Sequence, residues 1–562
     1  MPASPWEFDE PLFFQALHEY NPVAHHPPPP GYPVFIFTAK LFRLFIPSDF
    51  AALVSVSVIA SAIAFYLLAL AFGKLAGDPT AGLAGAILFY LSPTMLIHST
   101  LPISEPGALA LFAGALYFTQ QPSNPATKQP FLFALFAALA VGWRIQFAIF
   151  VVPFFLVAVA MMPRWRDRLI ALGTFTVVCL IWLTPLTAAV GGVENLIQFE
   201  TKQAGYLAAH DADESRTGWT APRIALRFIA HPWGTKITSV PLLLLAFLGL
   251  RRVRKEFIPL AAGGVVYIAF ALWSMDPADG ARYSIPFMIC VAFLAGLGSA
   301  WLWRPYLIAA AFSIASVIYV SSFLTQRSTV TSPPVRAAQF ARQAWPPNSV
   351  ALYELSLWPH ATYYLGDRNP KRVDVGLASY LERPEVPMFI YADGAAEDAT
   401  VFRWWPSDAY TKLTRNHYRV ASIIPVNTRF KVIRGVFVPE REPEGASWRW
   451  ISDEGEIQLP RGGERTLLLT LGLPVLYPFE RNELTISVDG RVARIVRLER
   501  DRQATVEIRV PAGSPVIGFR AARSFVPAEV PGSLNRDRRR LSVKIYRIET
   551  SGSRAARQAA SQ

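Results

Sequence analysis

Charged residues are scarce in this 562-residue chain, because Asp, Glu, Lys and Arg together make up 17% of it while hydrophobic residues make up 52%. Mean hydropathy is +0.29. This balance excludes an ordinary soluble globule and a disordered chain, and it predicts a membrane protein. Residues 1–325 hold 19 Lys and Arg against 16 Asp and Glu, and the remainder hold 35 against 25. The second part therefore has the charge density of a water-facing domain.

Cysteine is equally scarce, since only Cys179 and Cys290 occur and both lie in apolar runs. No disulfide framework is available to the second part, so cysteine does not identify its compartment.

Basic residues are missing before Lys40, and the opening MPASPWEFDEPLFFQALHEY carries four acids, which is unlike a signal peptide. We expect either that this end is exported with the first helix or that a further helix precedes it.

Apolar runs that suit a bilayer core of about 30 Å recur along the first part. The expected spans are residues 50–73, 81–97, 104–119, 130–143, 145–162, 169–190, 237–250, 257–274, 284–303 and 305–324. The short connections of one side hold ten Lys and Arg against three acids, which by the positive-inside rule makes that side cytoplasmic. We therefore expect a polytopic α-helical bundle of about ten spans in a bacterial inner membrane, with its long loops in the periplasm.

Two polar elements lie in the first outer segment. Asp9 and Glu10 in WEFDEP precede an aromatic amphipathic stretch, so the pair is either a general base beside the lipid or part of a solvated turn. His25 and His26 open HHPPPPGYP, whose prolines predict a rigid extended segment. These imidazoles could bind a phosphate or a sugar, or could be interfacial polar residues. No further ligands stand at metal spacing, so no cofactor is assigned and a divalent metal is left open.

Isolated charges mark the other outer turns. Glu105 in ISEPG suits a helix N-terminus, where it would stabilise the helix or orient a substrate. Arg144 in GWRIQF and Arg282 in GARYSIP are cations beside apolar spans, where a lipid phosphate or a structural carboxylate is the expected partner. Lys202 in the outer loop 191–236 could line an acceptor groove. The chain contains no P-loop and no GxSxG elbow.

The acidic pair, the HPP element, the S-E-P turn and the R-Y-x-x-P element follow one another on the same expected side of the membrane. Over roughly residues 6–325, the chain resembles the C-type integral-membrane glycosyltransferases, in the branch of the protein O-mannosyltransferases and lipid A aminoarabinose transferases. In that family the donor is a sugar on a polyprenyl phosphate. The resemblance implies Asp9 as the base with Glu10 supporting it. It further implies a substrate-binding set of His25 or His26, Glu105, Arg282 and Tyr283, with Arg144 as a phosphate ligand by position.

The resemblance implies an inverting glycosyltransferase, whose acceptor is a protein, a lipid or a polysaccharide. One carboxylate would suffice as base, because a phosphate stabilised by arginine leaves without a general acid. Two other functions stay open. A transporter or flippase of lipid-linked glycans would carry ionisable residues in mid-membrane, and a non-catalytic membrane subunit would dock glycans through its soluble part. Basic residues of the second part alternate with acids, so no nucleic-acid partner is expected.

The second part divides by pattern. Residues 326–444 mix helical and strand-like stretches and predict a periplasmic α/β domain after the transmembrane domain 1–325. Residues 445–551 hold short strands separated by Gly, Pro and Asp turns, which predicts a β-sandwich that either docks carbohydrate or acts as a scaffold. Residues 552–562 are expected to be a disordered tail.

Overall fold

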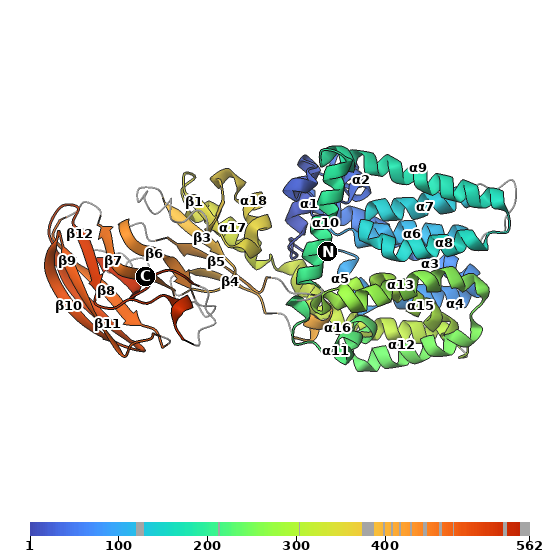
Figure 1. The fold of residues 1–562 in the computed structure, drawn as a ribbon. Helices are drawn as coiled ribbons and strands as arrows, with labels where there is room; N and C mark the ends of the chain where they lie inside the picture. Colours follow the sequence, from blue (N-terminus) through green and yellow to red (C-terminus); the bar gives the residue numbers. More distant parts are fainter. Residues whose placement is uncertain are drawn as a thin grey trace. The chain divides into compact units, whose positions relative to one another are not determined.

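The chain forms two compact units in the computed structural model, Met1–Ser332 with Trp405–Arg419 and Pro333–Trp404 with Val420–Gln562. The first is helical and the second is rich in strands (Figure 1). The structure describes the whole chain apart from residues 120–128, 212–213, 303, 374–386, 397–398, 406–407, 415–417, 427–429, 442–446, 460–462, 476, 532–536 and 551–562. The expected disordered tail thus lies outside the described residues.

The first unit contains bundled helices, many of which run alongside one another in Figure 1. Their bounds are α1 (Glu10–His18), α2 (Pro33–Arg43), α3 (Asp49–Ala76), α4 (Pro79–Tyr90), α5 (Pro93–His98), α6 (Glu105–Thr119), α7 (Gln129–Trp143), α8 (Ala148–Met161), α9 (Trp165–Ala189), α10 (Val193–His210), α11 (Ala221–Ala225), α12 (Lys236–Gly249), α13 (Ile258–Ser274), α14 (Gly280–Tyr283), α15 (Ile285–Ser299) and α16 (Pro305–Thr329).

Each expected span overlaps helical structure, and the apolar helices make the chain a multi-pass membrane protein. Within the described ranges, four helical stretches are long and apolar enough to cross a bilayer: Asp49–Ala76, Trp165–Ala189, Lys255–Ser274 and Pro305–Ala344. Two bent pairs would raise this number to six, Ala221–Trp233 with Lys236–Arg252 at 92° and Pro277–Tyr283 with Ile285–Ser299 at 55°. Other apolar helices of the bundle are shorter, and the count of about ten spans stays a prediction.

Local chemistry explains where helices begin. The Ser48 hydroxyl accepts a hydrogen bond from the Ala51 N–H at the start of α3. The expected span 81–97 is divided into α4 and α5, because Ser92 caps a new helix by accepting from the Met95 N–H and Pro93 offers no N–H to continue α4.

Small residues let the bundle pack closely. Gly298 of α15 lies so near the Leu245 carbonyl of α12 that an added Cβ would collide with it. Close helix approach through glycine is common in membrane bundles, where packing rather than water drives association. The α12–α15 contact therefore depends on the missing side chain.

The second unit contains a mixed five-stranded sheet in the order β2-β1-β3-β5-β4. Strands β1 and β2 and strands β1 and β3 are parallel, whereas β5 is antiparallel to both β3 and β4. Helices α17 and α18 belong to the same unit, and an α/β domain at residues 326–444 stays a prediction. The bounds of these helices and strands are α17 (Pro333–Ala344), β1 (Val350–Tyr353), α18 (Trp358–Tyr364), β2 (Lys371–Arg372), β3 (Met388–Ala392), β4 (Thr400–Arg403) and β5 (Val420–Pro425).

An eight-stranded antiparallel sheet follows, with the path β10-β9-β12-β7-β13-β8-β11 and β6 paired to β7. Strand β7 pairs with β13 near its start and with β12 near its end. It therefore joins two groups of strands, β13, β8 and β11 on one side and β12, β9 and β10 on the other, which share a core that includes Leu469, Ile486 and Ile517. The expected β-sandwich stays a prediction. The bounds are β6 (Lys431–Arg441), β7 (Ser447–Gln458), β8 (Arg465–Leu473), β9 (Arg481–Val488), β10 (Arg491–Glu499), β11 (Arg502–Val510), β12 (Val516–Ala521) and β13 (Lys544–Thr550).

Candidate active site

Three of the predicted site residues form one ionic group, called the Glu105 cluster below: Glu105, Arg144 and Arg282. Glu105 is 6% exposed, and its Oε1 lies 3.1 Å from Arg144 Nη1 and 2.5 Å from Arg282 Nε. Arg144 Nη1 also donates to the Ser104 hydroxyl at 2.8 Å. Two guanidiniums therefore share one carboxylate, and Asp279 adds a negative charge near Arg282.

Interruptions of the helices bring these side chains together. Glu105 begins α6, directly after a non-helical turn. Arg144 is extended, with φ −145° and ψ 101°, between α7 and the 3-10 turn Ile145–Phe147. Arg282 lies in α14, before the 55° bend that leads into α15. Since a charge among apolar spans is costly without a partner, ends and breaks of helices are where paired charges are expected.

Tyr32 is influenced electrostatically by both the Glu105 cluster and Asp9. This buried residue precedes α2, and its phenol oxygen accepts a hydrogen bond from Gln146 Nε2 at 3.2 Å. Burial raises the pKa of Tyr32 above its ordinary value, Arg144 lowers it, and Asp9 and Glu105 raise it. Three predicted residues therefore act electrostatically on one phenol, which brings them into one neighbourhood.

Asp9, His25 and Lys202 form a second group. Asp9 is half-buried at the start of α1, His25 is exposed in a left-handed conformation with φ 60°, and Lys202 is exposed on α10. Partial desolvation lowers the pKa of His25, Asp9 opposes this shift, and Lys202 adds to it. The charges of Asp9 and Lys202 thus both affect the pKa of His25, although 193 positions separate Asp9 from Lys202 in the sequence.

Glu10 is placed differently from its neighbour Asp9. It is fully buried, and its Oε2 accepts hydrogen bonds from the backbone N–H groups of Trp6 at 2.5 Å and Glu7 at 3.1 Å. Burial raises the pKa of Glu10 to about 8, with a further rise from the Glu7 charge and an opposing effect of Arg327. The side chain is therefore largely protonated at neutral pH. Its hydrogen bonds to the Trp6 and Glu7 N–H groups close the turn that leads into α1. Glu10 would therefore support Asp9 by holding the backbone of this turn.

The remaining predicted residues are His26 and Tyr283. Burial lowers the pKa of His26, while Glu19 raises it and His25 lowers it. Its Nδ1 is buried without a hydrogen-bond partner among the described residues. Tyr283 lies at the end of α14, and its carbonyl accepts from the Tyr267 hydroxyl at 2.8 Å.

Sequence reasoning missed Tyr32 and Gln146, which share a hydrogen bond next to the predicted site residues. Tyr32 belongs to the same HHPPPPGYP stretch as the histidines, and Gln146 follows Arg144 by two residues. The available signal was their position, since each is a polar side chain close to a predicted site residue in an apolar region. This signal does not reveal which distant residue the side chain contacts.

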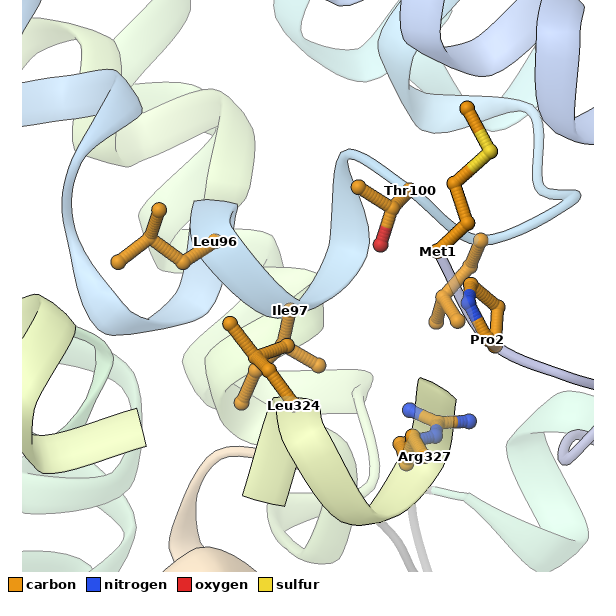
Figure 2. A pocket seen from close by; sticks show the side chains of 8 residues that line it. Met1, Pro2, Leu96, Ile97, Thr100, Leu324 and Arg327 are labelled. Carbon is orange, nitrogen blue, oxygen red and sulfur yellow. The ribbon is translucent and has the colours of Figure 1, made fainter. Parts of the chain in front are cut away.

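A cavity of about 90 Å³ lies elsewhere in the helical unit, between α5, α16 and the N-terminal residues (Figure 2). Its lining is apolar apart from Thr100 and Arg327, and it includes none of the nine predicted site residues. The lining residues are Met1, Pro2, Leu96, Ile97, Thr100, Leu101, Leu324 and Arg327. Among the described residues, no three His, Cys, Asp or Glu side chains group together as metal ligands would.

No protein-family model matches the chain. No curated protein matches it either. Solved structures do resemble it. ArnT from Cupriavidus metallidurans, bound to undecaprenyl phosphate, shares 11% identity at a TM-score of 0.47, over 74% of this chain and 93% of that one. The archaeal oligosaccharyltransferase AglB from Archaeoglobus fulgidus, in complex with an inhibitory peptide and a dolichol-phosphate, shares 10% identity at a TM-score of 0.39, over 92% and 91%.

The arabinofuranosyltransferase AftD from Mycobacteria shares 11% identity at a TM-score of 0.39, over 98% of this chain and 57% of that one. The resemblance to integral-membrane glycosyltransferases expected from the sequence is thus found among solved structures. At these identities and TM-scores the matches carry no argument about this chain, so its fold and its activity have to be argued from its own residues.

Proposed function

We propose that this protein is an inverting glycosyltransferase that moves a sugar from a polyprenyl phosphate to an acceptor hydroxyl at the periplasmic face of a bacterial inner membrane. The observation that carries the proposal is the Glu105 cluster, in which Arg144 Nη1 and Arg282 Nε lie 3.1 Å and 2.5 Å from one Glu105 oxygen at breaks of the helices. The half-buried Asp9 carboxylate is the candidate base, and it acts electrostatically on Tyr32 together with Arg144, which lies at the broken end of an apolar helix. A base and a phosphate-binding cation are the two parts that such a transfer requires.

In the proposed reaction, the acceptor hydroxyl oxygen attacks the anomeric carbon of the donor and its proton passes to the Asp9 carboxylate. The bond between the anomeric carbon and the phosphate oxygen breaks, and polyprenyl phosphate leaves with the electron pair. Attack from the face opposite the phosphate inverts the configuration. A second carboxylate acid is not needed, because the leaving phosphate is already a stable anion when cations face it.

Arg144 and Arg282 suit the phosphate for a geometric reason. A guanidinium has five N–H donors in a planar fork, and the shared Glu105 oxygen occupies only some of those on each arginine. Their side chains are 14% and 13% exposed, so neither is sealed from a ligand. Low dielectric at the membrane edge strengthens such contacts relative to water. Lys202 and His25 would face the acceptor side, next to Asp9.

The decisive measurement is release of polyprenyl phosphate when the purified protein is incubated with a panel of polyprenyl-phosphate sugars and candidate acceptors. Asp9→Asn removes the base while keeping the size of the side chain, and the release rate should fall by about a hundred- to ten-thousandfold. The matched control is Glu19→Gln, because Glu19 is an exposed acid just after the same helix. An Asp9→Asn protein that folds and releases polyprenyl phosphate at the normal rate refutes the catalytic assignment.

The same assay separates the proposal from its competitors. A transporter or flippase moves the lipid-linked glycan intact, so no polyprenyl phosphate would be released with any donor. A non-catalytic subunit that docks glycans would bind them through residues 445–551 and would be indifferent to Asp9→Asn.

A further inference from the structure

A segment between two strands of the second unit belongs to the helical unit. Residues 405–419, called the inserted segment below, connect β4 to β5 and pack with the first compact unit. The Tyr410 hydroxyl donates to the Tyr319 carbonyl at 2.9 Å, and its ring lies 4.9 Å from that of Phe323. Both partners lie on α16. The inserted segment is therefore anchored to the last helix of the bundle.

The inserted segment also reaches the acidic turn near the chain start. The Thr414 hydroxyl, 3% exposed, donates to Glu7 Oε1 at 3.4 Å. Arg327 of α16 is 4% exposed, and its Nη2 lies 3.5 Å from the same oxygen. A buried carboxylate is costly without partners, so the Thr414 hydroxyl and the Arg327 guanidinium both contribute to keeping Glu7 in place.

Residues 1–10 are tied to α16 at further points. The Ala3 N–H donates to the Arg327 carbonyl at 2.8 Å, and the Arg327 guanidinium lies 5.3 Å from the centre of the Trp6 ring. Glu10 then closes the turn from Trp6 to α1. Asp9 stands inside this turn, one residue before Glu10, so its position follows from how the turn is held.

We propose that Arg327 and Thr414 are positioning residues, which hold the turn 6–10 through the Glu7 carboxylate and so place Asp9 for its reaction. This role rests on the function proposed above. The chain of the second unit is then more than an attached module, because the inserted segment between its strands β4 and β5 completes the support of a site in the helical unit. Catalysis is sensitive to such support, since a misplacement of about 1 Å can cost on the order of a hundredfold in rate.

The test compares variants of the full-length protein. Thr414→Val removes one hydroxyl at nearly constant volume, and Thr329→Val is its matched control, because the exposed Thr329 hydroxyl bonds only within its own helix. Arg327→Met removes the charge, and Arg327→Lys restores a cation next to Glu7. Each variant is measured for kcat and donor KM of polyprenyl phosphate release, and for hydrogen exchange of peptides covering residues 3–18.

The expected result is a fall of about tenfold or more in kcat for Thr414→Val and Arg327→Met, with donor KM unchanged, faster exchange in the turn 6–10, and partial recovery in Arg327→Lys. Thr329→Val should match the wild type. The inference is overturned if kcat and exchange stay unchanged, if only KM rises, or if kcat falls while exchange in the turn stays at the wild-type level.

Failure of the function itself would look different. If the wild type releases no polyprenyl phosphate from any donor, the proposed function fails while the exchange measurement still decides whether Thr414 and Arg327 hold the turn. Faster exchange in the variants would then support their structural hold on residues 6–10, and unchanged exchange would overturn it. Should Arg327→Met fail to fold, Thr414→Val carries the test alone.

Discussion

Replacing Glu10 by Gln should remove a pH dependence from the stability of this protein. Glu10 is fully buried and its pKa is raised from 4.5 to about 8, chiefly by burial and then by the Glu7 charge. The folded state therefore disfavours the ionised carboxylate. The contribution of Glu10 to the free energy of unfolding is fully present below pH about 4.5 and is lost as the pH rises through about 8. Gln cannot ionise, yet its amide oxygen can still accept the N–H groups of Trp6 and Glu7.

The size of the effect follows from the shift. A difference between 4.5 and about 8, at about 1.4 kcal/mol per unit, corresponds to about 5 kcal/mol once Glu10 is ionised in both states. The side chain is wholly buried, so solvent does not screen this cost. Glu10→Gln and the wild type should have similar thermal midpoints near pH 5, and the variant should be increasingly the more stable towards pH 8.5.

The assay is thermal unfolding in detergent, followed by intrinsic fluorescence at one heating rate across pH 5 to 8.5. Glu19→Gln serves as the control, because it removes an exposed acid next to the same helix and should show no growing difference. A gap between Glu10→Gln and the wild type that stays constant with pH would refute the reasoning. Glu10→Gln should also keep its transfer activity, in contrast to Asp9→Asn, because a protonated side chain is not the base.

Two further substitutions test the Glu105 cluster and the bundle. Glu105→Gln leaves two largely buried guanidiniums, 14% and 13% exposed, without the Glu105 carboxylate and should destabilise the protein by about 3 kcal/mol. Adding Arg282→Gln should cost less than the sum of the single changes, and additive shifts in thermal unfolding would contradict this. Gly298→Ala places a Cβ against the Leu245 carbonyl and should cost about 1–3 kcal/mol by the same assay. Gly173→Ala is its control, since no atom lies near the added carbon, and an equal effect of both would refute the packing argument.

The helical elements could be predicted from the sequence because their signal is local. A run of about twenty apolar residues has to satisfy its backbone internally in lipid, which leaves the helix as the solution wherever the run occurs. Asp9, Glu105, Arg144 and Arg282 were also recognisable as candidates, since each is a charge beside an apolar stretch.

Partners could not be predicted in the same way. Arg282 and Glu105 are 177 positions apart, and Thr414 and Glu7 are 407 apart, so no window of sequence contains either pair. From the sequence, Asp9 and Glu10 were likewise interpreted as one acidic pair. The tertiary structure separates them, because the chain turns at residues 6–10 and directs one carboxyl group onto backbone N–H groups.

Composition and periodicity by themselves determined the membrane half, its helices and the set of charges able to do chemistry, because the cost of burying charge and backbone in lipid acts residue by residue. Tertiary structure alone decided that Glu105 meets Arg144 and Arg282, and that residues 405–419 join the helical unit. Those outcomes depend on packing between distant segments, which no local preference specifies.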